Sequence, residues 1–134
     1  MNADYREAAS PYLVALEGHS DARGILKVLS FESMNFKAAR IFNIQVSDLK
    51  YSRGGHAHKQ CSQLFFCGFG RCEIFVKNLS GEYRFELDPT NCLVVPPYNW
   101  AEIWFKTLST SVTVLASHEY DPRDYIYTTP ELKD

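Results

Sequence analysis

Arg53-Gly54-Gly55-His56-Ala57-His58-Lys59 is the stretch that decides both the fold and the chemistry of this chain. It holds two of the four histidines, and a strongly β-forming run follows at residues 63–67. Because side chains alternate between the two faces of a strand, His56 and His58 share one face and Ala57 takes the other. If that face looks into a barrel, the two imidazoles suit either metal binding or proton transfer. The alternative is a pair of surface histidines on a loop.

The rest of the chain reads as short apolar segments separated by turns. Strands are expected at residues 12–16, 25–31, 40–46, 63–67, 72–76, 83–87, 92–95, 100–105 and 112–116. Residues 1–11 are expected to be a short helical turn or loose. The tail from Tyr120 is expected to dock on the body or on a partner, and its tyrosines are candidates to pack on a second subunit. The pattern predicts a single all-β domain over residues 1–134, a sandwich or barrel.

Composition excludes several classes of protein. The 134 residues are 46% hydrophobic and 22% charged, with a net charge of −2, which predicts a globular protein without a basic surface for nucleic acid. The N-terminus lacks the apolar core of a signal peptide, and no apolar run reaches the length of a membrane span. The four cysteines form no Cys-x-x-Cys pair. Three of them lie in apolar runs, so we expect buried free thiols and a cytoplasmic location.

The order of these elements resembles the cupin family of small jelly-roll β-barrels. The first cupin motif is His-x-His, three or four residues, Glu, six residues and Gly. Here His56 and His58 are followed at the same spacing by Gln63 and Gly70. The second motif ends in a histidine, where Ala101 stands here. A metal-binding cupin uses three histidines and the carboxylate, and two imidazoles are too few for a tight site. The resemblance therefore implies a cupin-type jelly-roll β-barrel without a metal or other cofactor.

A closer resemblance covers most of the chain. Besides residues 53–59 and Gln63, it is carried by Asp21-Ala22-Arg23-Gly24, Arg40-Ile41-Phe42, Val94-Val95-Pro96-Pro97, Trp100-x-Glu102, Leu115-Ala116-Ser117, Tyr120-Asp121 and Asp124-Tyr125-Ile126. In these segments the chain resembles the dTDP-4-dehydro-6-deoxyglucose 3,4-ketoisomerases. Those enzymes make precursors of amino sugars for surface polysaccharides, such as the lipopolysaccharide O-antigen, and for antibiotics. The resemblance implies a homodimeric isomerase whose substrate is a dTDP-linked 4-keto-6-deoxy sugar.

The chemistry of such an enzyme gives these residues their expected roles. Moving the ketone from C4 to C3 requires removal of the C3 proton, an enediol, and protonation of C4. By resemblance His56 and His58 are the catalytic pair, since histidine transfers protons near neutral pH. The diphosphate needs guanidinium groups, for which Arg23 and Arg53 are the candidates. Gln63 is expected to hold a histidine in one tautomer or to bond a sugar hydroxyl.

Three further substrate-binding candidates are Asn43, Glu102 and Lys59. For Arg23, Glu102 and Lys59 the plainer alternative is a solvated surface position. The ketoisomerases commonly have a tyrosine where Asn43 stands and a histidine where Ala101 stands. These departures keep two other functions open. One is a degenerate cupin that binds a sugar nucleotide without catalysis, and the other is a 4-keto sugar-nucleotide epimerase. A metal-dependent cupin such as a dioxygenase is a further alternative.

Overall fold

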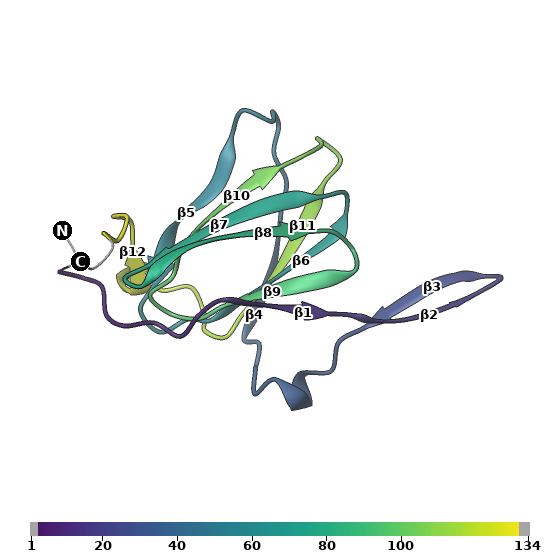
Figure 1. Cartoon of the computed structure of the whole chain (residues 1–134), viewed down its shortest axis with the longest axis horizontal. Coiled ribbons are helices and arrows are strands. Elements are labelled where there is room, and N and C mark those ends of the chain that lie inside the picture. The colour runs from purple at the N-terminus through teal and green to yellow at the C-terminus, as the bar shows by residue number, and fades with distance from the viewer. Residues whose placement is uncertain (1–2, 132–134) are drawn as a thin grey trace.

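Two antiparallel β-sheets of five strands each face one another in the computed structural model, which describes residues 3–131 (Figure 1). Across the first sheet the strands are β1 (Tyr12–Ala15), β9 (Asn91–Val95), β6 (Gln63–Phe69), β11 (Ser111–Ala116) and β4 (Arg40–Ile44). Across the second they are β12 (Tyr125–Ile126), β5 (Ser52–His58), β10 (Trp100–Phe105), β7 (Cys72–Asn78) and β8 (Gly81–Leu87). The all-β prediction is confirmed, and two facing sheets fit a jelly roll.

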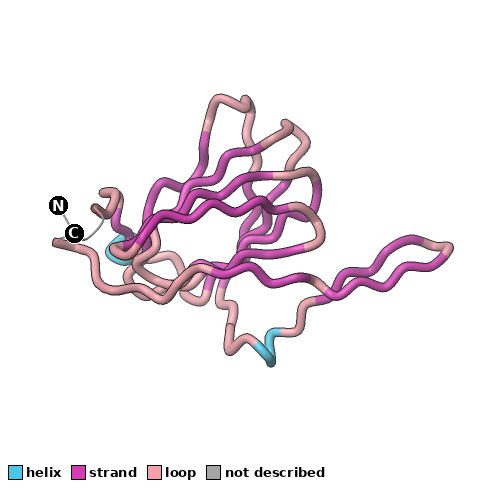
Figure 2. The backbone as a smooth tube through the Cα atoms, viewed as in Figure 1, coloured by secondary structure: helices cyan, strands magenta, loops and turns pink. Residues whose placement is uncertain are grey.

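The remaining strands, β2 (Glu17–Asp21) and β3 (Gly24–Val28), form a hairpin of their own. This hairpin extends away from the two sheets (Figure 1), and all of its strand residues are exposed. Residues 3–131 also contain two single-turn 3₁₀ helices, η1 (Phe31–Ser33) and η2 (Pro122–Asp124), and otherwise strands and loops (Figure 2). Within that part of the chain, no helix has the length and apolar character needed to cross a membrane.

The core lies between the two sheets, where alternate side chains of each strand point inward. Its buried members are Phe65, Cys67, Leu93, Val95, Val112 and Val114 from the first sheet, and Cys72, Ile74, Val76, Leu87, Ala101, Ile103 and Phe105 from the second. Burial of this apolar surface is the main favourable contribution to folding. Three of these residues, Phe65, Ala101 and Ile103, also line the cavity described below, so the core forms its apolar wall.

The two ends of the chain meet over β5. Strand β12 pairs with β5, and Ile126 joins Tyr5 and Ala57 in a buried cluster on the outer face of that strand. The hydroxyl of Tyr5 donates to the carbonyl oxygen of Thr128 at 2.6 Å. The tail therefore docks on the body of its own subunit, which settles a point that the sequence left open.

The predicted strands agree with the structure to within two residues at each end, except for the one predicted at residues 25–31. The polar segment that forms β2 was not expected as a strand, because a hairpin exposed on both faces shows no hydrophobic alternation. Strand β3 ends at Val28, three residues early, and η1 follows. Residues 3–11 contain no helix, and residues 1 and 2 of that predicted turn lie outside the described residues.

Candidate active site

A cavity of about 340 Å³ opens between the sheets, bounded by β4, β5, β6, β10 and the C-terminal tail. Its polar lining includes Arg40, Arg53, His56, Gln63, Tyr120 and Tyr125, with Asn43 at its edge. Its apolar wall includes Phe42, Phe65 and Ala101. Five separate segments of the chain thus form a cavity with both polar groups and an apolar wall, as a binding site for a charged sugar ligand requires.

A β-bulge directs the first histidine toward this cavity. Ala101 of β10 pairs with His56, whereas Glu102 pairs with Gly54, so Gly55 is left without a partner. Gly54 and Gly55 have φ angles of 87° and 81°, in the left-handed region that favours glycine. A Cβ on Gly54 would lie 2.9 Å from the carbonyl oxygen of Ala101. The two glycines of the motif are therefore what allows the chain to enter the histidine segment at this angle.

The two imidazoles lie side by side, as the alternation predicts. Their ring centroids are 5.1 Å apart and their planes nearly perpendicular, while Ala57 is buried on the opposite face. His56 lines the cavity, and His58 lies deeper, with 5% of its surface exposed. Nδ1 of His56 and Nε2 of His58 are buried without a hydrogen-bond partner among the described residues. Each ring thus keeps one nitrogen free for a ligand or a proton.

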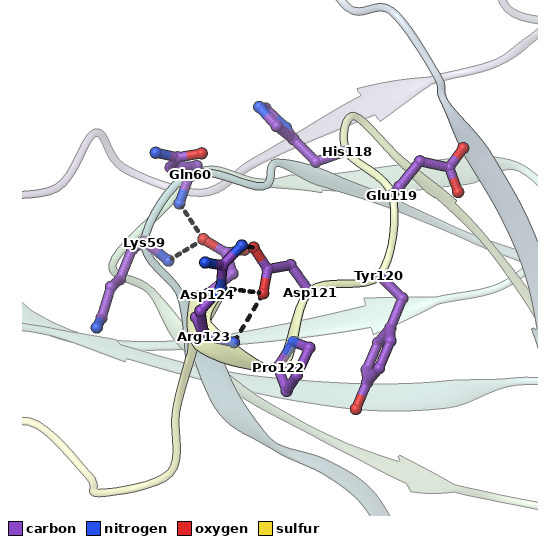
Figure 3. Close-up of a pocket in the computed structure, with 9 residues that line it drawn as sticks. All are labelled: Lys59, Gln60, His118, Glu119, Tyr120, Asp121, Pro122, Arg123 and Asp124. Atoms are coloured by element: carbon purple, nitrogen blue, oxygen red, sulfur yellow. Dashed lines mark hydrogen bonds and ion pairs between the residues drawn. The ribbon is translucent and has the colours of Figure 1, made fainter.

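Asp124 fixes the second histidine. Its Oδ2 lies 2.9 Å from Nδ1 of His58, and its two oxygens accept the backbone N–H groups of Lys59, Gln60 and Cys61 (the first two are drawn in Figure 3). An ionised carboxylate can only accept, so Nδ1 of His58 carries the proton in this bond. In the neutral ring Nε2 is then the basic nitrogen.

Burial lowers the pKa of both histidines. That of His56 falls to about 4, chiefly because the ring is desolvated and secondly because His58 lies beside it. Burial also lowers the pKa of His58, although its hydrogen bond to Asp124 opposes the effect. Both imidazoles are therefore neutral at pH 7, the form that can accept a proton.

The free energy of unfolding is expected to decrease as the pH is lowered from about 6.5 to about 4. In that window an unfolded chain protonates its histidines, whereas the folded protein keeps His56 neutral because its pKa is about 4. The unfolded state then binds more protons, so stability rises with pH. Urea unfolding at pH 7, 6 and 5 measures the slope. His56→Asn should make it shallower, and an unchanged slope would contradict the buried position of His56.

His58, Cys61 and Asp124 also form a group of possible metal ligands, with ligand atoms within 4.8 Å of one another. The carboxylate is already occupied by His58 and by three backbone N–H groups. The protonated Nδ1 of His58 cannot bind a metal, and the thiol of Cys61 bonds to the carbonyl oxygen of Ser62. This cluster is better suited to orienting His58 than to holding a metal ion.

Two other predicted residues lie at the cavity with His56. Gln63 is 5% exposed and shares the inward face of β6 with Phe65. Arg53 stands exposed at the rim, where its Nη1 donates to the carbonyl oxygen of Gln45 at 2.9 Å. The structure therefore brings together the histidine, the amide and one of the two arginines.

Asn43, predicted to bind the substrate, lies at the edge of the cavity. The residue borders the cavity, but Phe42 and Ile44 on either side of it pack into the core. Its side chain therefore points to the outer face of the sheet. There its amide donates to the hydroxyls of Ser111 and Thr113 at 2.7 and 3.2 Å. The side chain that β4 presents to the cavity at this point is Phe42.

Glu102, also predicted to bind the substrate, has the same outward orientation. It lies between the buried residues Ala101 and Ile103, so its side chain faces outward. Its carboxylate accepts from the Ser52 hydroxyl at 3.1 Å and from Nε1 of Trp104 at 2.9 Å. The plainer reading, a carboxylate on the surface of the strand, fits this position.

Lys59 and Arg23 do not reach the cavity of their own subunit. Lys59 borders a separate open hollow of about 760 Å³ formed with residues 118–124, where its backbone N–H holds Asp124 (Figure 3). Arg23 lies at the tip of the β2–β3 hairpin, 91% exposed, in an ion pair of 2.7 Å with Asp21. Within one protomer, neither side chain is among the residues that line the cavity.

Four side chains at or beside the site were not assigned to it from the sequence: Arg40, Tyr120, Asp124 and Tyr125. Tyr125 was expected at a subunit interface, yet its ring lies 4.8 Å from that of His56 and 4.4 Å from that of His58. The segment Asp124-Tyr125-Ile126 was part of the family resemblance. Without periodicity in the tail, no signal placed it against β5.

Comparisons with known proteins find matches along most of the chain. The family model described as FdtA: WxcM-like, C-terminal, matches residues 10–134. A TDP-4-oxo-6-deoxy-alpha-D-glucose-3,4-oxoisomerase from Aneurinibacillus thermoaerophilus is 33% identical over 109 residues, which make up 79% of this chain and 78% of that protein.

Two solved structures are similar over nearly the whole chain. A mutant of the 3,4-ketoisomerase QdtA from Thermoanaerobacterium thermosaccharolyticum, in complex with TDP-4-keto-6-deoxyglucose, is 30% identical with a TM-score of 0.80, and the match covers 88% of this chain and 87% of that one. The WlaRB TDP-quinovose 3,4-ketoisomerase from Campylobacter jejuni is 28% identical with a TM-score of 0.79, over 88% of this chain and 92% of that one.

Proposed function

Because the chain belongs to the FdtA (WxcM-like, C-terminal) family of sugar-nucleotide 3,4-ketoisomerases, we propose that it converts a dTDP-linked 4-keto-6-deoxyhexose into the 3-keto isomer. The observation that carries the proposal is the pair of neutral imidazoles at the cavity, each with a free ring nitrogen and one held by a carboxylate. This arrangement supports a base that takes a proton from carbon near neutral pH.

The reaction can be followed proton by proton. His56 faces the cavity, so it removes the C3 proton, and the electrons of that C–H bond form the C3–C4 double bond of an enediol. The C4 oxygen gains a proton in the same step. The C3 hydroxyl then loses its proton to become the ketone, while C4 is protonated. Either His56 or His58 returns the proton to C4. Which of the two does so decides which C4 epimer forms.

The other cavity residues are assigned to the ligand. Arg53 stands at the rim, where its guanidinium can donate to the diphosphate oxygens. Gln63 lies inside the cavity with an amide that can bond a sugar hydroxyl. Arg40 adds a positive charge beside the developing enediolate.

Catalysis of this kind needs no metal ion. The carbanion is stabilised by the adjacent carbonyl group, and hydrogen-bond donors at the cavity can stabilise the oxyanion. The atoms best placed to bind a metal, those of His58 and Asp124, are instead hydrogen-bonded to each other and to backbone N–H groups. Turnover that depends on an added divalent cation would contradict this assignment.

A binding protein without catalysis is the less favoured function. The substitution at Asn43 removes no polar group from the cavity, because that side chain faces outward. Ala101 does line the cavity, and its small side chain lies on the strand that pairs with His56. The histidine pair and its carboxylate partner are intact, which supports an active enzyme.

Carbon-13 NMR of the product tests the proposed function. With dTDP-4-keto-6-deoxyglucose as substrate, we expect the ketone to appear at C3. A ketone that stays at C4 next to an inverted carbon would identify an epimerase. An unchanged substrate that binds to the protein would identify a binding module.

A homodimer is proposed as the active form. The β2–β3 hairpin stands free of the sheets (Figure 1), and it exposes Ile25 (71%) and Leu26 (61%). An isolated two-stranded hairpin is marginally stable in water, so a second surface is needed to hold it. An apolar groove of about 250 Å³ at the base of the hairpin, lined by Leu29 and by Ile41 (66% exposed), supports packing of a second copy there. Arg23 at the tip would then serve the partner's cavity.

Light scattering and kinetics test the dimer and Arg23 separately. We expect the wild-type protein to be a dimer and Ile25→Asp/Leu26→Asp to be a monomer, because a charged hairpin cannot pack on an apolar surface. Leu49→Asp, at an exposed loop position elsewhere, is the control that should stay dimeric. Arg23→Ala should stay dimeric and raise KM about 10-fold, the loss of one charged contact to phosphate. A monomeric wild-type protein would refute the proposal.

A cytoplasmic location completes the proposal. All four cysteines are buried and free, with no disulfide among them. This is the usual state in a reducing compartment. The product of the reaction would feed the synthesis of amino sugars for surface polysaccharides, for which the 3-keto group is the site of amination.

A further inference from the structure

Tyr125 holds the position from which a hydroxyl can serve both imidazoles. It lies directly opposite His58 in the β12–β5 pairing, and its ring is 4.4 Å from that of His58 and 4.8 Å from that of His56. It also lines the cavity with His56. A small β-strand at the end of the chain thus brings one phenol group to the point where the substrate would meet the catalytic pair.

Arg40 supports the hydroxyl of Tyr125. The guanidinium lines the same cavity as the phenol, and its interaction with the hydroxyl acts to lower the pKa of Tyr125. Arginine can only donate, so toward this guanidinium the oxygen of Tyr125 can only accept, and the proton of the phenol remains available to a ligand. Burial raises the pKa of Tyr125, and the interaction with Arg40 opposes but does not cancel that effect. The phenol therefore stays protonated at neutral pH and next to a positive charge.

The reaction requires a proton transfer between two oxygens, a role to which neither histidine is assigned. Ketone transfer moves one proton between two carbons and a second proton between two oxygens. His56 is assigned to the carbon proton. Nδ1 of His58 is committed to Asp124, and His58 is not among the residues that line the cavity. Neither Phe42 nor Ala101 offers a hydroxyl on its side of the cavity. Of the two tyrosines that line it, Tyr120 is 61% exposed, which leaves Tyr125 as the more enclosed donor.

We propose that Tyr125 is a catalytic residue that carries the oxygen proton, an inference that rests on the proposed isomerase function. Its hydroxyl gives a proton to the C4 oxygen as His56 removes the C3 proton. The phenolate, held by Arg40, then takes the proton of the C3 hydroxyl while C4 is protonated. Tyr125 and the histidine thus regain their starting protonation states at the end of the reaction, and no further reactant is needed.

The test uses Tyr125→Phe, which removes the hydroxyl and keeps the ring against both histidines. The matched control is Tyr127→Phe, because Tyr127 lies on the same tail, stacks on Tyr125 and is 68% exposed. Two rates are measured with dTDP-4-keto-6-deoxyglucose in deuterium oxide. One is deuterium exchange at C3 of the remaining substrate, and the other is formation of the 3-keto product.

We expect Tyr125→Phe to lower product formation roughly 10²-fold, as loss of a general acid does, with an unchanged melting temperature. Exchange at C3 should fall less, because His56 can still remove the carbon proton. The ratio of exchange to product formation should therefore rise at least 10-fold, whereas Tyr127→Phe should leave it unchanged.

Two results would overturn the role of Tyr125 alone. One is a fully active Tyr125→Phe variant beside an active wild-type protein. The other is an equal fall in exchange and product formation, which indicates a structural role. A wild-type protein that forms no 3-keto product would instead refute the proposed function, and the role of Tyr125 in it would fall as well.

Discussion

Replacing His56 with asparagine is expected to lower turnover by about 10³-fold or more, since a general base accounts for 10²- to 10⁴-fold of rate. Asparagine fills a similar space and can hydrogen-bond, but it cannot accept the C3 proton. The buried position of His56, with its pKa lowered to about 4, keeps the native imidazole neutral and ready to do so. The rate is measured as formation of the 3-keto product by NMR.

His118→Asn is the matched control for this experiment. His118 is exposed, and its ring bonds to the neighbouring Ser117 hydroxyl at 2.8 Å, away from the histidine pair. It should keep wild-type turnover. His56→Asn should still bind dTDP, because none of the groups assigned to the diphosphate is changed. A His56→Asn variant that retains a tenth of wild-type turnover would contradict the role of His56.

Replacing Asp124 with asparagine is expected to give the second-largest loss, about 10²-fold or more in turnover with a loss of about 2 kcal/mol in stability. The carboxylate accepts from His58 and from the backbone N–H groups of Lys59, Gln60 and Cys61. An amide has one accepting oxygen, and its NH₂ group would face a donor. His58 would lose its fixed tautomer, and some of the three backbone N–H groups would lose their acceptor.

Asp121→Asn is the control for Asp124→Asn. Asp121 caps η2 in the same loop, where it accepts from Arg123 at the surface. Its replacement should leave turnover and the melting temperature nearly unchanged. Urea unfolding and steady-state kinetics on both variants decide the point. Equal behaviour of the two variants would show that Asp124 is merely a loop cap.

Strand alternation is the physical rule that made most of the fold readable. It correctly paired His56 with His58 and predicted Ala57 on the opposite face. The same rule, applied to Asn43 between Phe42 and Ile44, or to Glu102 between Ala101 and Ile103, gives their outward positions. The two assignments to substrate binding came from motif positions, whereas alternation places both side chains on the outer face.

The residues that could not be foreseen depend on contacts across long stretches of chain. Asp124 and Tyr125 reach the histidines through a two-residue strand, and their neighbours in sequence show no period that would place them. Arg40 was read as part of a strand, but only the pairing of β4 with β11 brings it to the cavity. The position of Arg23 depends on a hairpin whose strand residues are all exposed.

Proton NMR of dTDP-4-keto-6-deoxyglucose in deuterium oxide with the wild-type protein tests the central claim most directly. The predicted result is loss of the C3 proton signal together with the appearance of a 3-keto product, and neither change with His56→Asn. Substrate that keeps its C3 proton and its C4 ketone, while its lines broaden through binding, would contradict the proposed catalysis.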